Sequence, residues 1–337
     1  MGRSHAKAYA TNPGFEVVGL VNRSPVELAG PLAGYEVKPS FADALRDLAP
    51  DLCSINTYPD SHAEYAMMAM KAGADVFLEK PLATTVEDAE RVIACARTNG
   101  RKLVVGYILR HHPSWQRLIA EARVLGGPYV FRMNLNQQSD GQGWDAHKAL
   151  LRTTSPIVDC GVHYVDVMCQ ITDSAPRWVR GMGLRLSDEI ASGIHNYGHF
   201  QVGFEDGSLG WYESGWGPMI SETASFVKDV LSPRGSVSIV AHTSGKASDV
   251  ETAMSAATIH VHRSKLGPDG RFAGTDELVE MGDVSNPQDL CDRQAAFVLD
   301  VIRNDIDLTR HLQDAFQSLR ICLAADASVR AAAEINL

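Results

Sequence analysis

The chain has 337 residues, of which 45% are hydrophobic and 21% are charged, and this composition excludes a disordered, collagenous or disulfide-stapled protein. At roughly 150 residues per domain, the length predicts two domains with a substantial core. The 31 basic and 41 acidic side chains leave a formal charge of −10, which argues against nonspecific binding to nucleic acid or anionic membranes. A local basic pocket for a phosphate is still compatible with this balance.

The cysteines and the apolar segments indicate a cytoplasmic protein without a membrane partner. None of the six cysteines is spaced as CxxC, so we expect reduced and mostly buried thiols. No segment approaches the roughly 18 consecutive apolar residues that a membrane helix needs. The start, residues 1–5, also lacks the apolar region of a secretory signal.

Short apolar runs alternate with amphipathic stretches over the first hundred residues. Apolar runs of this length are typical of parallel strands buried on both faces, and they occupy residues 16–22, 51–57, 74–80 and 102–108. The patterns around them predict helices at residues 4–11, 40–48, 61–72 and 85–99. The last of these has an N-cap signal at its start, at Thr85, and a C-cap signal at Asn99-Gly100. Repeated β-α units predict an α/β fold with a doubly wound parallel sheet, which binds ligands at the carboxyl ends of its strands.

The pattern changes after about residue 125, where strand-like segments follow one another with few helices between them. These segments are residues 128–137, 178–186, 197–204, 208–216, 225–231, 236–241 and 258–263. They predict a largely antiparallel sheet in a second domain. Two helical patterns, residues 288–303 and 311–333, close the chain.

The opening segment Gly2-Arg3-Ser4 leads directly into a helix, as the third glycine of a dinucleotide fingerprint would, although an ordinary turn gives the same pattern. About 20 residues further on, the second strand ends in Asn22-Arg23-Ser24. An acidic residue there would bind the ribose diol of NAD, whereas Arg23 can pair with the 2′-phosphate of NADP. A surface arginine after a strand explains the spacing about equally well.

A polar loop, residues 56–62, follows a predicted buried strand and enters a helix. Its candidate ligand contacts are Thr57, Tyr58, Pro59 and His62, because the carboxyl end of a strand is where such a sheet receives its ligand. The alternative is that Ser61 only caps the helix and His62 is exposed.

The tripeptide Glu79-Lys80-Pro81 places an ionisable pair at the end of an apolar strand. A lysine near a partly buried strand end can act as an acid or stabilise a developing charge. Pro81 fixes the backbone immediately afterwards. The alternative is a surface ion pair between Glu79 and Lys80.

Asp159, His163 and Asp166 form the densest polar pattern of the sequence. If the segment is helical, the spacing i, i+4, i+7 places both carboxylates and the imidazole on one face. Such a stripe can transfer protons, and it could also ligate a metal, which the lack of a second cluster disfavours. A purely structural hydrogen-bond network is an equally good interpretation of this segment alone.

Trp144 lies in the Gly/Asp/Gln-rich segment 138–147, which we interpret as an irregular loop. A loop of this length between regular elements is often functional, so Trp144 is a candidate aromatic lid over a sugar or a nicotinamide. The adjacent His111 and His112, and the pair His260 and His262, are not expected to be metal ligands.

Taken together, these segments resemble the Gfo/Idh/MocA oxidoreductases, the family of glucose-fructose oxidoreductase and inositol dehydrogenase. The resemblance extends over nearly the whole chain, and the matching segments are residues 1–5, 59–62, 79–81, 159–166 and 313–315. It implies a Rossmann domain at residues 1–110 and, at residues 111–337, an α/β domain with C-terminal helices and a large, open, mostly antiparallel sheet. The open sheet face implies a homodimer or homotetramer.

The resemblance also implies a reaction, with Lys80, His163 and Asp159 as the catalytic residues. His163 exchanges a proton with a hydroxyl of a sugar or polyol, Lys80 stabilises the developing alkoxide, and Asp159 orients the substrate or His163. No metal is implied. NADP is the favoured cofactor, with NAD as the alternative. The expected cofactor contacts are Gly2, Arg3, Ser4, Asn22, Arg23, Ser24, Thr57, Tyr58, Pro59, His62, Glu79, Lys80 and Trp144.

The sequence departs from the family pattern in two places. The first strand and the first two glycines of the phosphate loop are absent ahead of Gly2, so we expect this start to lie a few residues inside the gene product. Residues 153–156 replace a stretch that is often glycine-rich, and the substrate assignment is open for that reason. A regulatory protein of the same fold that binds NAD(P) without catalysis is the alternative function.

Overall fold

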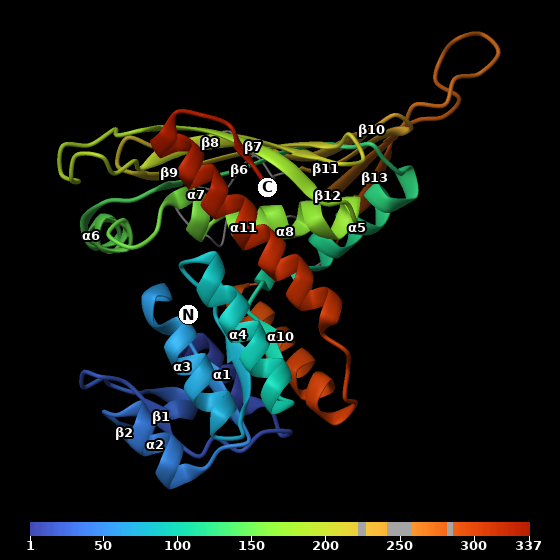
Figure 1. The fold of residues 1–337 in the computed structure, drawn as a ribbon. Coiled ribbons are helices and arrows are strands. Elements are labelled where there is room, and N and C mark those ends of the chain that lie inside the picture. Colours follow the sequence, from blue (N-terminus) through green and yellow to red (C-terminus); the bar gives the residue numbers. More distant parts are fainter. Residues whose placement is uncertain (222–226, 241–257, 282–285) are drawn as a thin grey trace. The chain divides into compact units, whose positions relative to one another are not determined.

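The computed structural model describes residues 1–221, 227–240, 258–281 and 286–337, and it divides into two compact units. The first unit contains Met1–Ile108 and Pro287–Phe316, and the second contains Leu109–Asn286 and Gln317–Leu337. The chain therefore returns to the first unit near its end (Figure 1).

The first unit alternates helices with short parallel strands. Its strands are β1 (Leu20–Val21), β2 (Val37–Lys38), β3 (Leu52–Ile55), β4 (Asp75–Leu78) and β5 (Leu103–Val105). Its helices are α1 (Gly2–Thr11), α2 (Phe41–Leu48), α3 (His62–Lys71), α4 (Val86–Asn99), α10 (Pro287–Arg303) and the start of α11 (Thr309–Ala331), with 3-10 turns η1 (Gly30–Leu32) and η2 (Pro59–Ser61). The β-α alternation expected from the apolar runs is thus confirmed.

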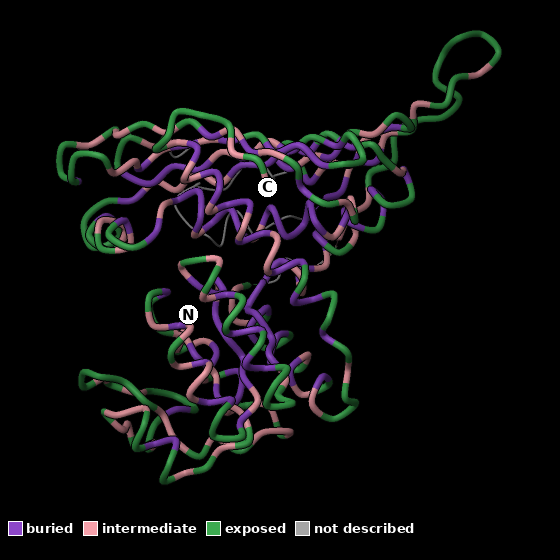
Figure 2. Tube along the Cα trace, in the orientation of Figure 1, coloured by how far each residue is buried: buried purple, intermediate pink, exposed green. Residues whose placement is uncertain are grey.

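The strands of the first unit form two hydrogen-bonded groups within the described residues. Strands β3, β4 and β5 pair in parallel in that order, and β1 pairs in parallel with β2. The central strand β4 is buried along Val76, Phe77 and Leu78, each at most 1% exposed. Buried backbone runs through the middle of this unit (Figure 2). The expectation of a seven-residue buried strand at 16–22 is wrong, because only Leu20 and Val21 pair and Val21 is exposed.

Local capping signals define helix α4 as the sequence predicts. The Thr85 side chain accepts a hydrogen bond from the Asp88 amide at the N-terminus, and Gly100 ends the helix at φ +60°. A residue with a β-carbon resists this left-handed conformation, so a glycine suits the position. Helix α4 is thereby fixed next to the loop that follows β4.

The second unit is built on one nine-stranded sheet. Its strands are β6 (Val130–Gln138), β7 (Pro176–Leu184), β8 (Tyr197–Phe204), β9 (Leu209–Gly217), β10 (Lys228–Ser232), β11 (Gly235–Val240), β12 (Thr258–Arg263), β13 (Glu277–Glu280) and β14 (Ile335–Asn336). The order is β13-β12-β11-β10-β6-β9-β8-β7-β14, and only the β6–β9 pair is parallel. The predicted large, mostly antiparallel sheet is confirmed.

Helices cover one face of this sheet (Figure 1). They are η3 (Ile108–His111) and α5 (Pro113–Leu125), α6 (Gly141–Leu150), α7 (Pro156–Asp159), α8 (Gly161–Thr172) and the rest of α11. Side chains alternate between the two faces, as in β11, where Val237 and Ile239 are buried and Ser236 and Ser238 are not. The uncovered face carries exposed apolar side chains, among them Val130, Met182, Leu184, Leu209, Leu231, Val240 and Leu278.

All six cysteines are buried and none forms a disulfide. Among the described helices, none combines the length and apolar character needed to cross a membrane.

Candidate functional site

The Glu79-Lys80-Pro81 loop leaves the carboxyl end of β4, and a buried histidine fixes its first residue. Glu79 is only 7% exposed, and its Oε1 lies 2.7 Å from Nε2 of His5, a 1% exposed residue of α1. The other Glu79 oxygen accepts a hydrogen bond from the Lys80 backbone amide at 3.1 Å. The alternative of a surface ion pair at Glu79 is wrong, because this carboxylate is buried against α1.

His62 joins this loop to the loop that follows β3. Its Nδ1 lies 2.7 Å from the Pro81 carbonyl oxygen and its Nε2 lies 3.1 Å from the Thr57 carbonyl oxygen. The ring is 0% exposed, and this burial lowers the pKa of His62. His62 therefore holds two loops together and is not presented to a ligand. The alternative of an exposed His62 is also wrong.

The other residues of the 56–62 loop lie at the carboxyl end of β3. Tyr58 is exposed and Pro59 is buried at the start of η2. Ser61 does not cap α3 as the alternative supposed, since its hydroxyl is hydrogen-bonded instead to Thr57 Oγ1 at 2.7 Å. The loop is closed on itself by side-chain contacts.

The N-terminus of α1 lies beside the same strand end. A β-carbon on Gly2 would be 3.5 Å from the Asn56 β-carbon, and the Asn56 Oδ1 is buried without a hydrogen-bond partner in the described part of the chain. Arg3 is exposed, and the Ser4 carbonyl accepts a hydrogen bond from Gln288 of α10. The unpaired amides of a helix start attract a phosphate, and Asn56 Oδ1 can accept from a hydroxyl or amide. This strand end therefore fits a nucleotide.

Asn22, Arg23 and Ser24 follow β1 in an exposed turn. The Asn22 side-chain amide donates to the Ser24 carbonyl oxygen at 2.7 Å, which shapes the turn. Arg23 has no acidic neighbour at either adjacent position of the sequence. The turn thus presents an exposed guanidinium with no carboxylate beside it in the sequence.

In the second unit, the predicted helical stripe is split between two helices. Asp159 ends α7, and His163 lies in the first turn of α8; both are half-buried. Asp166 is 1% exposed and forms an ion pair with the Arg110 guanidinium, whose Nε donates a hydrogen bond to Oδ2 at 2.8 Å. Gln170 also donates to Asp166 at 2.9 Å. The carboxylate of Asp166 is consequently structural, and the polar pair of this segment is Asp159 and His163.

The segment expected to be a loop with a lid contains helix α6 instead. Trp144 is 4% exposed, and its ring packs against Gly217 at the end of β9. Burial of this indole stabilises the helix despite Gly141 and Gly143 in its first turn. The expectation of an irregular loop is wrong, because a helix forms here and Trp144 is packed in the core of this unit; its contact with a sugar or a nicotinamide stays a prediction.

One residue of α6 escaped the sequence analysis. The His147 ring stacks on the Trp216 ring with centroids 4.6 Å apart and planes 4° apart, and its Nδ1 lies 2.9 Å from Ser139 Oγ. Burial lowers the pKa of His147, and the Asp159 charge partly opposes this effect. The spacing of Trp144 and His147, three residues apart, is the only sequence signal that would have suggested a shared helix.

Three further histidines have structural partners. His112 is 0% exposed and its Nδ1 accepts from the Ser114 amide at the start of α5. His260 and His262 both contact Asp276, and these contacts lower the pKa of the Asp276 carboxyl. Within the described ranges, no group of three or more His, Cys, Asp or Glu side chains is arranged to hold a metal ion.

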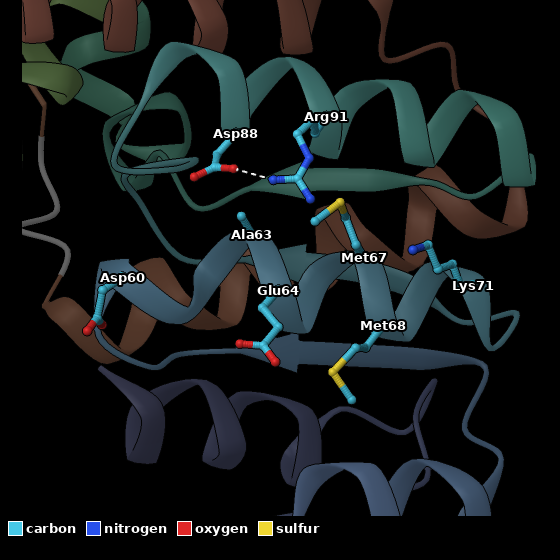
Figure 3. A pocket seen from close by; sticks show the side chains of 8 residues that line it. All are labelled: Asp60, Ala63, Glu64, Met67, Met68, Lys71, Asp88 and Arg91. Carbon is cyan, nitrogen blue, oxygen red and sulfur yellow. Dashed lines mark hydrogen bonds and ion pairs between the residues drawn. The ribbon is translucent and has the colours of Figure 1, made fainter.

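A hollow of about 270 Å³ lies between α3 and α4 (Figure 3). Its lining residues are Asp60, Ala63, Glu64, Met67, Met68, Lys71, Asp88 and Arg91. Two of these residues, both on α4, form a hydrogen bond: the Arg91 guanidinium donates to Asp88 Oδ1 at 2.8 Å. None of the residues expected to hold the cofactor or to act in catalysis lines this hollow, although Asp60 belongs to the 56–62 loop.

These observations define a class of protein. The first unit has parallel strands, and helix α1 starts at their carboxyl edge. Two loops at the same edge are joined through His62. This is the arrangement of a dinucleotide-binding domain. The second unit adds an open sheet with an Asp–His pair on the covering helices. Residues 1–107 match the model described as "Oxidoreductase family, NAD-binding Rossmann fold", and residues 116–224 match "GFO/IDH/MocA C-terminal domain".

Together, the two matches cover more than half of the chain, which therefore belongs to the Gfo/Idh/MocA oxidoreductase family. It is 28% identical over 203 residues to inositol 2-dehydrogenase from Acidothermus cellulolyticus, an alignment that spans 58% of this chain and 58% of that protein. The alignments with the next two curated relatives span 37% and 42% of those proteins.

Solved structures of similar fold extend over nearly the whole chain. Scyllo-inositol dehydrogenase from Lactobacillus casei with bound NAD(H) and scyllo-inositol gives a TM-score of 0.76 at 16% identity, covering 99% of this chain and 95% of that one. The WlbA dehydrogenase from Bordetella pertussis with NADH and UDP-GlcNAcA gives 0.75 at 19% identity, covering 100% and 95%. At these identities the likeness confirms the fold: a Rossmann domain followed by an α/β domain.

Proposed function

We propose that this protein is an NAD(P)-dependent dehydrogenase or reductase that transfers hydride between a nicotinamide and a hydroxyl-bearing or carbonyl carbon of a sugar, sugar derivative or cyclitol. One observation carries the proposal: this member of the family has all three candidate catalytic residues. Lys80 lies on a loop at the edge of the Rossmann sheet that side-chain contacts hold in place, and Asp159 and His163 lie on helices of the second domain. The relatives named as inositol dehydrogenases support the substrate class.

The nicotinamide, when bound, supplies the acceptor or donor of the hydride. His163 takes the proton from the substrate hydroxyl during oxidation and returns it during reduction. The Lys80 ammonium stabilises the negative charge that develops on the same oxygen. Asp159 accepts a hydrogen bond that orients the substrate or the His163 ring. All three assignments are proposals that follow from the family resemblance and the chemistry of these groups.

Contacts made by the residues next to Lys80 hold the backbone of this loop in place. The contacts of His5 with Glu79 and of His62 with Pro81 fix the backbone on both sides of the lysine. Because the backbone is already fixed, the Lys80 ammonium loses less conformational freedom when it binds a substrate oxygen. Thr57, Tyr58 and Gly2–Ser4 complete the strand-end site that we propose for the nicotinamide and the pyrophosphate.

We propose NADP as the preferred cofactor, because the Arg23 guanidinium, just after β1, can pair with the 2′-phosphate of NADP. A carboxylate at this position would repel that phosphate. The two solved structures named above contain NAD(H), and NAD is the alternative for this chain.

We also propose a homodimer or homotetramer that buries the uncovered sheet face. This face presents apolar side chains such as Met182, Leu184 and Leu278, which are 55%, 55% and 64% exposed. Exposed apolar groups on one surface favour self-association. The six buried, unbridged cysteines fit a reducing, cytoplasmic location.

The test is turnover after the substitution Lys80→Ala, with cofactor affinity measured in parallel. Polyols and sugars are first screened with NAD⁺ and NADP⁺ to find a substrate. Loss of one electrostatic stabiliser should lower kcat by about 10²-fold or more. The dissociation constant of the reduced cofactor, from fluorescence titration, should change little.

The outcome separates the enzyme from its alternative. Unchanged turnover in the variant would show that Lys80 has no role in the chemistry. Tight cofactor binding by the wild-type protein without turnover of any polyol or sugar would instead favour a regulatory protein that binds NAD(P) without catalysis.

A further inference from the structure

The second domain holds an imidazole that the proposed reaction does not use. His147 is half-buried, and its ring is fixed on two sides: flat against Trp216, and through Nδ1 against Ser139. These partners come from the ends of β9 and β6, so three separate elements define one ring orientation. Its Nε2 makes no hydrogen bond to any residue that the structure describes.

A chain of contacts connects this imidazole with Asp159. The Trp216 indole Nε1 donates to the Gln137 Oε1 at 2.8 Å, and the Cys160 thiol lies 3.4 Å from the same oxygen. The Cys160 sulfur is also 3.7 Å from Asp159 Oδ2. His147 and Asp159 therefore border one polar cluster inside the second domain, close enough for the charge of Asp159 to act on the imidazole.

The chemistry of this cluster suits a neutral polyol. A carboxylate accepts a hydrogen bond from a hydroxyl, and a ring nitrogen of a neutral imidazole either donates to a hydroxyl oxygen or accepts from its proton. Two such groups at one site can hold two hydroxyls of the same molecule. A ring locked by stacking loses little freedom when it does so.

We infer that His147 binds a substrate hydroxyl through Nε2, beside the hydroxyl that Asp159 and His163 engage. This inference rests on the proposed function and narrows its substrate class. The preferred substrate carries a second hydroxyl next to the reacting carbon, and a simple secondary alcohol is a poor substrate. His147 thus acts as a specificity residue rather than as a proton carrier.

The test compares the variant His147→Phe with wild type in equilibrium binding and in turnover. Phenylalanine keeps a flat ring for Trp216 but has no nitrogen. We expect the dissociation constant of the best polyol, measured by calorimetry on the protein saturated with oxidised cofactor, to rise about 10-fold or more. KM should rise in step while kcat falls less, and cofactor affinity should stay unchanged.

A set of deoxy analogues of the same polyol makes the test specific. One analogue, which lacks the hydroxyl that His147 contacts, should bind wild type and His147→Phe equally. The neighbouring Lys148→Gln, which removes a surface pair with Glu189 on the same helix, serves as the matched control and should behave as wild type. If His147→Phe does not fold, His147→Leu, which also lacks a hydrogen-bonding group, is measured in its place.

The outcomes distinguish this inference from the proposed function. Equal polyol affinity in His147→Phe and wild type, or an equal loss with every analogue, overturns the role of His147 and leaves the dehydrogenase assignment intact. Polyol binding that weakens in the variant, in a protein without turnover, supports the His147 contact and refutes the enzyme. A wild-type protein that binds no polyol overturns the inference.

Discussion

A lysine buried under helix α8 gives a quantitative prediction for stability. Lys228 on β10 is 2% exposed, its Nζ lies 4.6 Å from the centre of the Tyr164 ring, and the Asn134 Oδ1 is 3.3 Å away. Burial lowers the pKa of Lys228 from 10.5 to about 7, against the opposing effects of Glu213 and Cys160. The substitution Lys228→Met keeps an unbranched apolar side chain and removes the amine.

The sign and size of the effect follow from proton linkage. Between about pH 7 and 10.5 the unfolded chain holds a proton on Lys228 and the folded chain does not, so the wild-type unfolding free energy rises with pH in this window. One pH unit contributes about 1.4 kcal/mol. The methionine variant lacks this contribution, so its unfolding free energy relative to that of wild type should fall by about 2 kcal/mol from pH 7 to pH 9, since the folded lysine is already half deprotonated at pH 7.

The assay is urea unfolding followed by tryptophan fluorescence at several pH values. All five tryptophans lie in the second unit, which also holds Lys228, and they are Trp115, Trp144, Trp178, Trp211 and Trp216. Lys265→Met, at an exposed position in the same unit, is the control and should follow the wild-type curve. An advantage of Lys228→Met that is equal at pH 7 and pH 9 would refute the reasoning.

Three further predictions concern named contacts. Arg23→Ala should weaken NADPH binding about 10-fold relative to NADH in fluorescence titrations, and equal or tighter NADH binding by wild type would overturn the interpretation of Arg23. Asp166→Leu should lower the unfolding free energy by about 3 kcal/mol, because it leaves the Arg110 guanidinium without its carboxylate; adding Arg110→Met should recover part of this loss in urea unfolding. His62→Leu removes the ring nitrogens that contact the Thr57 and Pro81 carbonyls, one of which receives the N–H of the neutral imidazole, and should cost about 1–3 kcal/mol, with a lower kcat; an unchanged melting temperature and kcat would show that His62 does not hold the loops.

Local patterns predicted much of the fold. The apolar runs located β3, β4 and β5, and Thr85 and Gly100 marked both ends of α4, since these signals depend on residues a few positions apart. Strands β2 and β14, at two residues each, and β13, at four, were missed. These segments lack the apolar runs that marked β3, β4 and β5, and their extended shape depends on the strand that each pairs with.

Helix α6 shows where local signals mislead. Asp140, Gly141 and Gly143 indicate a turn-rich loop, and glycine weakens a helix by about 1 kcal/mol relative to alanine. The helix forms because Trp144 is buried against Gly217, 73 positions further along the chain, and because His147 stacks on Trp216. Burying a large aromatic side chain outweighs a glycine penalty of this size.

The sequence by itself determined the order of elements, the two-domain α/β architecture and the candidate residues Lys80, Asp159 and His163. Only the tertiary structure decided which polar side chains meet: His5 with Glu79, His62 with Pro81, and Arg110 with Asp166. Hydrophobic periodicity is a local property that any short window of sequence displays. The partner of a buried polar group lies 74, 19 or 56 positions away in these cases, and it is selected by the packing of whole elements, since such a group must find a hydrogen-bond partner.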